Sequence, residues 1–240
     1  MIRRLAHPLG EIQVTRKAIR HLYLRLDAES GALRVSAPRR LSDAEVLAFI
    51  DDRAHWIERQ RARQAERPPI FGATTLPDTI HLLGRAHALE RVTCPDLPAG
   101  RARVTLDDDR VRIHCGSDDP QAARQTARLA LREHCRDLLR TQLERRVEPW
   151  ARAMGLATPI HRIRRMRTRW GTCNIRDRRI WLNLELARMP VEVIDLVVVH
   201  ELAHLIERGH NRRFYAVMDD AYPDWRRWEP TLSEYGIIGL

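Results

Sequence analysis

The 240-residue sequence predicts an α+β fold, in which a β-rich region with one helix precedes a helix-rich region with its own small sheet. Two observations carry this prediction. Short segments of alternating apolar and polar residues, separated by turn residues, dominate residues 1–117. Longer segments with apolar residues at helical spacing dominate residues 118–240, which we expect to form one compact core.

The first part of the β-rich region is expected to hold three strands and then a helix. A turn at Glu29, Ser30 and Gly31 joins the second and third strands. Ser42 and Glu45 form a capping box at the start of the helix, and Pro68 and Pro69 stop it. The expected elements are strands at 11–16, 20–27 and 31–38 and one helix at 43–66.

The second part of this region carries four more strand-like segments. The last two flank three aspartates at 107–109, which suit a hairpin turn. The expected strands lie at 79–84, 87–94, 101–106 and 110–115.

A long helix is expected next. Asp119 can cap its first turn, and Pro120 can occupy its first position. Pro149 is expected to kink or end it. One apolar stripe predicts a core-facing side, formed by Leu131, Cys135, Leu138, Leu139, Leu143, Val147 and Trp150.

Residues 156–184 return to strand patterns, and a last buried helix follows. Ile180, Leu182 and Leu184 alternate with Trp181 and Asn183, as in a half-buried strand. Pro190 is placed to open the helix that contains "VVVHELAHLIERGH" at 197–210.

Composition and charge narrow the functional classes. No segment approaches the roughly 20 apolar residues of a membrane span, and the N-terminus lacks the apolar run of a signal peptide. The four cysteines show no C-x-x-C pair, so a reducing cytoplasm is expected. The net charge is +10, but only Lys17 among 42 basic residues is lysine, which favours a compositional preference for arginine over a specific anionic partner.

The apolar run at 197–210 contains the spacing of a zinc site. His200 and His204 are four residues apart, about 6 Å along a helix axis, and project from one face. Both imidazoles can reach one zinc ion, while Glu201 lies beside the metal as a base for a water molecule. The alternative, two histidines satisfied by hydrogen bonds in the core, explains the third nearby histidine poorly.

Catalytic zinc needs a third protein ligand, for which two residues compete. Glu207 continues the same helical face if the helix is unbroken. His210 can reach the metal only if the helix ends first, and Gly209 suits a left-handed helix terminus. We favour His210, and Glu207 stays open as a ligand or as a residue that orients a ligand histidine.

These motifs resemble the YgjP-like metal-dependent hydrolases, relatives of the SprT-like zinc metallopeptidases. The similarity lies in "HELAHLIERGHNRRFY", in "RMRTRWGTCN" upstream, and in "IWLNLELARMP" between them. Thr172 stands where the family usually has serine. Metzincins share the histidine spacing, but Glu207 replaces their glycine, so that family is rejected.

The resemblance implies a zincin-like catalytic core in residues 118–240, with a long helix, a small sheet and the H-E-x-x-H helix. It implies His200, His204 and His210 as ligands of one Zn²⁺ and Glu201 as the catalytic residue. In zincins an edge strand pairs with an extended peptide, and residues 180–184 are our candidate, with Trp181 and Asn183 as substrate contacts. Tyr215 can hydrogen-bond a developing oxyanion, or it can belong to the core.

The expected activity is that of a zinc metallopeptidase in which zinc activates a water and Glu201 removes its proton. Two alternatives stay open. The eight arginines of "HRIRRMRTRWGTCNIRDRR" can select a nucleotide phosphoanhydride, or they can bind nucleic acid in a protein whose protease activity is incidental. The arginine-rich segment involved is 162–179, and no membrane partner is expected.

Overall fold

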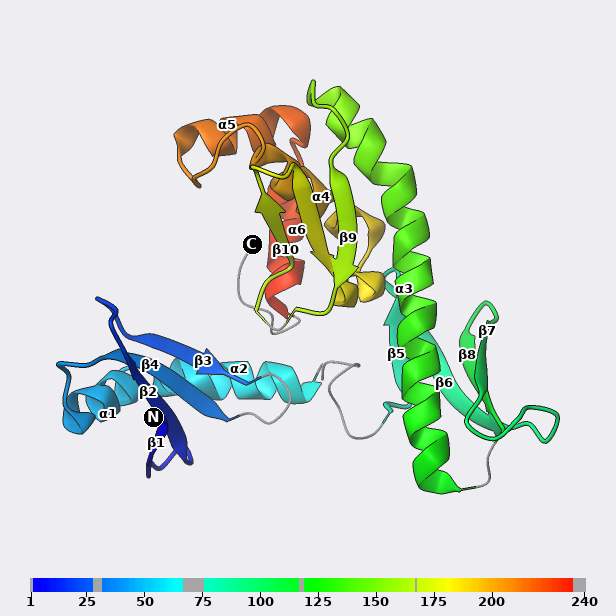
Figure 1. Cartoon of the computed structure of the whole chain (residues 1–240), viewed down its shortest axis with the longest axis horizontal. Coiled ribbons are helices and arrows are strands. Elements are labelled where there is room, and N and C mark those ends of the chain that lie inside the picture. Colours follow the sequence, from blue (N-terminus) through cyan, green and yellow to red (C-terminus); the bar gives the residue numbers. More distant parts are fainter. Residues whose placement is uncertain (1, 28–31, 67–75, 117–118, 167, 235–240) are drawn as a thin grey trace. The chain divides into compact units, whose positions relative to one another are not determined.

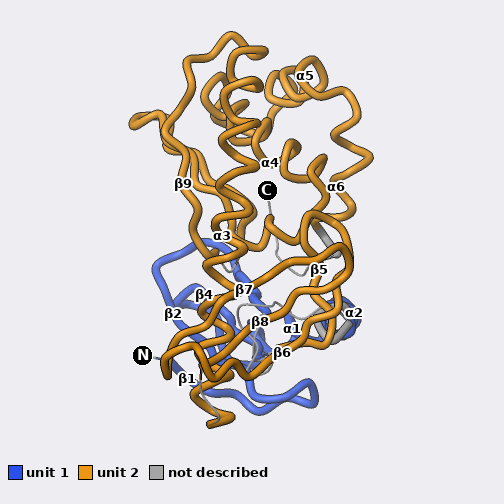
Figure 2. The backbone as a smooth tube through the Cα atoms, turned by 90° about the vertical axis from the view of Figure 1, so that its right-hand side faces the viewer, with its two compact units in different colours: residues 1–72, 234–236 blue, residues 73–233, 237–240 orange. Residues whose placement is uncertain are grey.

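The computed structural model describes residues 2–27, 32–66, 76–116, 119–166 and 168–234 (Figure 1). The chain falls into two compact units, consisting mainly of residues 1–72 and 73–233 (Figure 2). The α+β class expected from the sequence is confirmed. None of the helices in the described ranges is both long and apolar enough to cross a membrane.

The first unit is built on a four-stranded sheet. Its strands are β1 (Ile2–Leu5), β2 (Ile12–Lys17), β3 (Tyr23–Leu26) and β4 (Leu33–Pro38). They lie in the order β1-β2-β4-β3, with β2 and β4 parallel and the other pairs antiparallel. The three expected strands are confirmed. Strand β1 was not predicted, because its sequence, IRRL, shows no alternation of apolar and polar residues. Most of its residues are exposed in the structure. The expected turn at residues 29–31 lies outside the described residues.

Two helices follow in place of the single helix expected at 43–66. They are α1 (Asp43–Asp51) and α2 (Ala54–Glu66). The capping box at Ser42 is confirmed, with the Ser42 N–H 2.7 Å from Glu45 Oε2. Asp51 and Asp52 place negative charge at a helix carboxyl end, which disfavours continuation there. The core of this unit contains Ile12, Val14, Leu26, Leu33, Val35, Ala37, Val46, Ile50 and Ile57.

The second unit begins with a sheet of the same topology. Strands β5 (Thr79–Leu82), β6 (Arg85–Thr93), β7 (Ala102–Leu106) and β8 (Arg110–Cys115) confirm the four expected strands. Their order is β5-β6-β8-β7, and only β6 and β8 are parallel. In each unit, four strands with the same order and directions are therefore followed by a helix, although the sequence shows no internal repeat.

Helix α3 (Pro120–Ala153) is the longest element of the second unit. Asp119 caps it by accepting hydrogen bonds from the N–H groups of Gln121 and Ala122 at 3.1 and 3.3 Å. Of the two outcomes expected at Pro149, a kink or an end, the end was wrong, because α3 continues to Ala153. Most of the expected apolar stripe is buried. Strands β7 and β8 pack against α3, so the boundary between compact units lies near residue 72 and not at the expected 117.

A three-stranded sheet lies beside α3 (Figure 1). It comprises β9 (Ile160–Arg164), β10 (Gly171–Asn174) and β11 (Arg179–Asn183), in the order β10-β11-β9. The prediction that residues 180–184 form an edge strand was wrong, because β11 is central. The strand also stops at Asn183, whose side chain accepts from the Glu185 N–H and starts the 3-10 helix η1 (Leu184–Arg188).

Helix α4 (Val191–Ala203) packs against α3, β10 and β11, and it begins after Pro190 as expected. Helices α5 (Arg212–Ala221) and α6 (Trp225–Glu234) complete the described chain. Asp195 of α4 accepts hydrogen bonds from Trp150 Nε1 at 2.7 Å and Arg146 Nη1 at 3.1 Å. This network fixes α4 against α3. Burial raises the pKa of Asp195, which the hydrogen bond from Trp150 opposes.

We expect Asp195→Ala to lower the free energy of unfolding by about 2–3 kcal/mol, because it leaves two partly buried donors without their acceptor. Glu148→Ala removes an exposed pair with Arg152 on the same helix and should cost less than about 0.5 kcal/mol. Urea unfolding of both variants measures the difference. Equal losses would show that the network does not hold α4.

Candidate metal centre

Helix α4 carries His200 and Glu201, and it ends at Ala203 with His204 as its C-cap. The last turn tightens, since the N–H groups of Leu205 and Ile206 reach carbonyls only three residues back, at 2.9 Å each. The helix therefore stops well before Gly209. The prediction that Gly209 terminates it in the left-handed region was wrong, because the φ angle of Gly209 is not positive.

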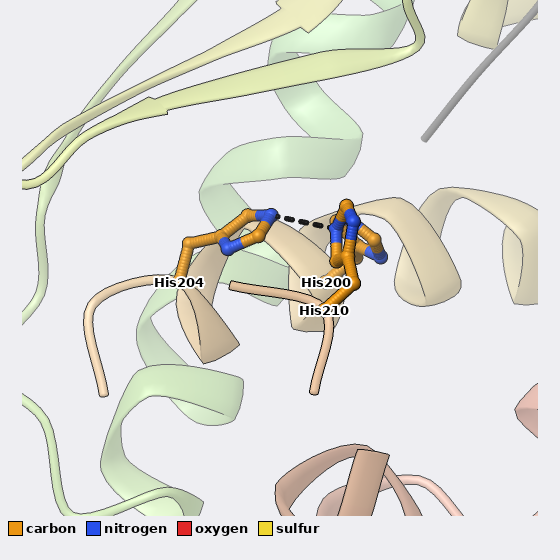
Figure 3. Close-up of side chains that lie close together, drawn as sticks. All are labelled: His200, His204 and His210. Carbon is orange, nitrogen blue, oxygen red and sulfur yellow. Dashed lines mark hydrogen bonds between the residues drawn. The ribbon is translucent and has the colours of Figure 1, made fainter. Parts of the chain in front are cut away.

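This early helix end lets the chain return His210 to the other two histidines. The Nε2 atom of His210 lies 3.1 Å from Nε2 of His200 and 3.1 Å from Nε2 of His204 (Figure 3). All three ligand atoms lie within 4.8 Å of one another. Asn211 then caps α5 by accepting from the N–H groups of Arg213 and Phe214, which fixes the loop behind His210.

Phe214 forms an apolar floor under the three imidazoles. Its ring centroid lies 5.0, 4.7 and 4.8 Å from those of His200, His204 and His210, and its side chain is buried. The Nδ1 atom of His204 lies 3.3 Å from the Glu207 carbonyl, which selects the tautomer with a free Nε2. Phe214 and the Glu207 carbonyl thus contact the rings on the side away from their Nε2 atoms, which converge.

The environment disfavours the charged forms of His200 and His204. Burial lowers the pKa of His200 to about 3, with further lowering by His204 and His210. Burial also lowers the pKa of His204, although its bond to the Glu207 carbonyl opposes this. His210 is exposed, so the cluster opens to solvent on that side.

The donor set fits a zinc ion. Tetrahedral nitrogen ligands at about 2.0–2.1 Å from zinc are separated from one another by roughly 3.3 Å. The 3.1 Å separations around His210 come close to that value. Three imidazoles on one side also leave a fourth position open, as catalytic zinc requires.

Glu201 follows His200 in α4 and is the expected base of the site. It is 2% exposed, and its Oε2 atom has no hydrogen-bond partner among the described residues. Burial raises the pKa of Glu201 to about 8, and the charge of Arg169 opposes that rise. A buried carboxylate with an unsatisfied oxygen, on the residue that follows His200, suits a group that acts on water.

Glu207 points elsewhere. Its carboxylate accepts from the Gly209 N–H at 3.4 Å and pairs with Arg213 at 3.9 Å. The metal-ligand cluster within the described ranges contains His210 and does not contain Glu207.

The three expected substrate contacts lie in different places. Asn183 is fully buried: its side chain donates to the carbonyls of Met166 and Arg169, at 2.9 and 2.8 Å, and accepts from the Met166 N–H. It therefore braces the loop before β10 and is not available to substrate. Tyr215 is 41% exposed and stacks on Trp225.

Trp181 faces a separate cavity. This cavity of about 380 Å³ lies between α3 and strands β9 and β11, and none of the three histidines lines it. Arg136, Arg140 and Arg162 give it a basic wall. Of the arginine-rich segment, Arg162 lines this cavity and Arg169 lies close enough to influence Glu201, whereas Arg167 is outside the described residues.

Sequence reasoning missed Phe214 and Gly171 as parts of the site. Both stand inside quoted motifs, "HNRRFY" and "RWGTC", but neither side chain offers a ligand or a proton. Their roles depend on contacts, which a motif does not show.

Comparisons with known proteins identify the family of this chain. No curated protein matches the chain. The crystal structure of the metallopeptidase zymogen of Pyrococcus abyssi abylysin covers 41% of this chain and 99% of its own, with 18% identity and a TM-score of 0.38. The family model of the YgjP-like metallopeptidase domain matches residues 20–235, which include the histidine cluster and Glu201. The chain therefore belongs to the YgjP-like metallopeptidase family, and it is a metal-dependent hydrolase.

Proposed function

We propose that this protein is a zinc-dependent peptidase that cleaves extended peptide segments. The observation that carries the proposal is the convergence of the three histidine Nε2 atoms beside the buried carboxylate of Glu201. His200, His204 and His210 would hold the ion. When bound, zinc would polarise the scissile carbonyl and lower the pKa of a water molecule toward 7.

Glu201 would remove a proton from that water and deliver it to the leaving amine nitrogen. The unsatisfied Oε2 atom supports this role, since it has the capacity to accept a hydrogen bond from water. The apolar floor at Phe214 and the buried wall of α4 would exclude bulk water and strengthen the charge interactions there.

Strand β10 replaces residues 180–184 as the proposed substrate-binding edge. It is an edge of its sheet, and its first residue, Gly171, lies against Glu201. A peptide added to β10 by backbone hydrogen bonds would pass beside the catalytic carboxylate, with little selection for side chains. Tyr215 stays a proposed substrate contact because it is exposed next to Phe214.

The nucleotide and nucleic-acid alternatives rest on the arginines alone. The basic cavity at Trp181 shares no lining residue with the histidine cluster, which favours the peptide proposal for the zinc site. Arg169 is exposed and influences Glu201, so it is the arginine best placed to contact an anionic substrate.

The zinc content of the purified protein tests the metal assignment. Protein prepared without chelator should contain about one zinc per chain, and His200→Ala or His204→Ala should lose it. Elemental analysis gives the stoichiometry. Occupancy far below one that does not rise on zinc addition would contradict the assignment.

Glu201→Gln tests the reaction. The variant should keep zinc and fold, but lose peptide hydrolysis by about 100- to 10,000-fold, because only the base is removed. The assay presents an unstructured peptide, a nucleoside triphosphate and duplex DNA to the same zinc-loaded protein. Phosphate release without peptide cleavage would overturn the peptidase proposal, and near-normal turnover by the variant would overturn the role of Glu201.

The third ligand is tested by comparing His210→Ala with Glu207→Ala. We expect the first to weaken zinc binding far more, because Glu207 approaches the cluster only through its backbone carbonyl. Glu207→Ala keeps that carbonyl and should therefore cost less than the about 10- to 100-fold typical of losing a group that orients a ligand. Competition with a chromogenic chelator measures both affinities, and the reverse ranking would assign Glu207 as ligand.

A further inference from the structure

Gly171, the first residue of β10, lies directly under the side chain of Glu201. A Cβ atom added at Gly171 would lie 2.7 Å from both Cγ and Cδ of Glu201, and closer still to Oε1. Real Cβ atoms do not approach other carbon atoms so closely, so the Glu201 side chain already fills the space that a side chain at position 171 would need.

The backbone conformation of Gly171 gives no other reason for glycine. Its φ angle is not among the positive values in the described chain, and any L-residue can adopt its extended conformation. Glycine is instead needed at position 171 because the Glu201 carboxylate lies too close to the backbone to leave room for a side chain.

The start of β10 cannot easily retreat from Glu201. Gly171 pairs with Leu182 of the central strand β11, and the Asn183 N–H donates to the Trp170 carbonyl at 2.8 Å. The Asn183 side chain also holds the Arg169 carbonyl at 2.8 Å, and Trp170 is buried. The strand is thus fixed on both sides of Gly171.

The backbone of Glu201 is held equally firmly. It lies in α4, where every residue from Leu196 to Ala203 is buried, and Asp195 ties the helix to Trp150 and Arg146. A methyl group at position 171 would therefore displace the end of the glutamate side chain, the one flexible part of the contact. Cys173, two residues along the same strand face, has its pKa raised by burial and then by Glu201, in agreement with a carboxylate that lies over β10.

We infer that Gly171 is a positioning residue for catalysis: its lack of a side chain allows the Glu201 side chain to lie across the start of β10. This inference rests on the proposed role of Glu201 as the base. It goes further by assigning a steric function to the glycine of the "RWGTC" segment. The effect of a larger residue would fall on catalysis more than on folding, because the displaced atoms belong to a flexible side chain.

Gly171→Ala tests this directly. We expect kcat for peptide hydrolysis to fall by at least about 100-fold, the loss of a mispositioned base, with KM changed less than about threefold. Zinc content should stay at one per chain, since Gly171 is not one of the candidate metal ligands. The matched control is Gly209→Ala, whose added Cβ would meet only Asn211 Nδ2 at 4.0 Å and which should keep kcat and zinc.

Glu201→Ala supplies the double-mutant cycle. It removes Cγ, Cδ and Oε1, the three atoms that a methyl group at position 171 would meet. We therefore expect the Gly171→Ala, Glu201→Ala double variant to be no less active than Glu201→Ala alone. Wild-type kcat in Gly171→Ala, or losses that multiply in the double variant, would overturn the inference.

A stability cycle on metal-free protein tests the contact without any activity. If Gly171→Ala lowers Tm or prevents folding, adding Glu201→Ala should restore Tm to that of Glu201→Ala alone, because the crowded atoms are gone. No restoration would overturn the inference. If Glu201→Gln were fully active, the proposed function would fail while this cycle still decided whether the contact exists.

Discussion

The site depends on where α4 ends. An unbroken helix would carry Glu207 onto the face of His200 and His204 and would take His210 away from it. The tight turn after Ala203 reverses this arrangement, since it frees the Glu207 carbonyl to hold His204 and returns His210 to within 3.1 Å of both partners. Because α4 ends there, the chain can turn and start α5 at the Asn211 cap, and α5 places Phe214 under the three imidazoles.

The second constraint is the burial of ionisable groups. His200 and Glu201 lie in the last part of α4, where the residues from Leu196 to Ala203 are otherwise apolar. Both side chains are almost fully buried, so they lose most of their contact with water. Burial pushes the pKa of His200 down and that of Glu201 up, so both groups are held neutral without a cation. A bound cation would favour the glutamate anion, so metal binding and the readiness of the base are linked.

The sequence predicted the features that periodicity and spacing determine. The helical face shared by His200 and His204, the cap at Asp119 and the strands from 79 to 115 are of this kind. It could not place β11, because a half-buried strand shows the same alternation at the centre of a small sheet as at its edge. The sequence also misplaced two helix ends. Helix α4 ends before Gly209, because the N–H groups of Leu205 and Ile206 bond to carbonyls three residues back. Helix α3 continues past Pro149, which lies close to its C-terminal end. The role of Gly171 was beyond reach, since it arises from a contact between residues 30 positions apart.

A crystal structure of the zinc-loaded protein, with anomalous scattering at the zinc edge, tests the central claim most directly. We expect one anomalous peak about 2.0–2.1 Å from the Nε2 atoms of His200, His204 and His210, with the Glu201 carboxylate near the metal but not coordinating it. A peak coordinated by the Glu207 carboxylate with His210 turned away would contradict it. A peak away from these histidines would contradict it equally.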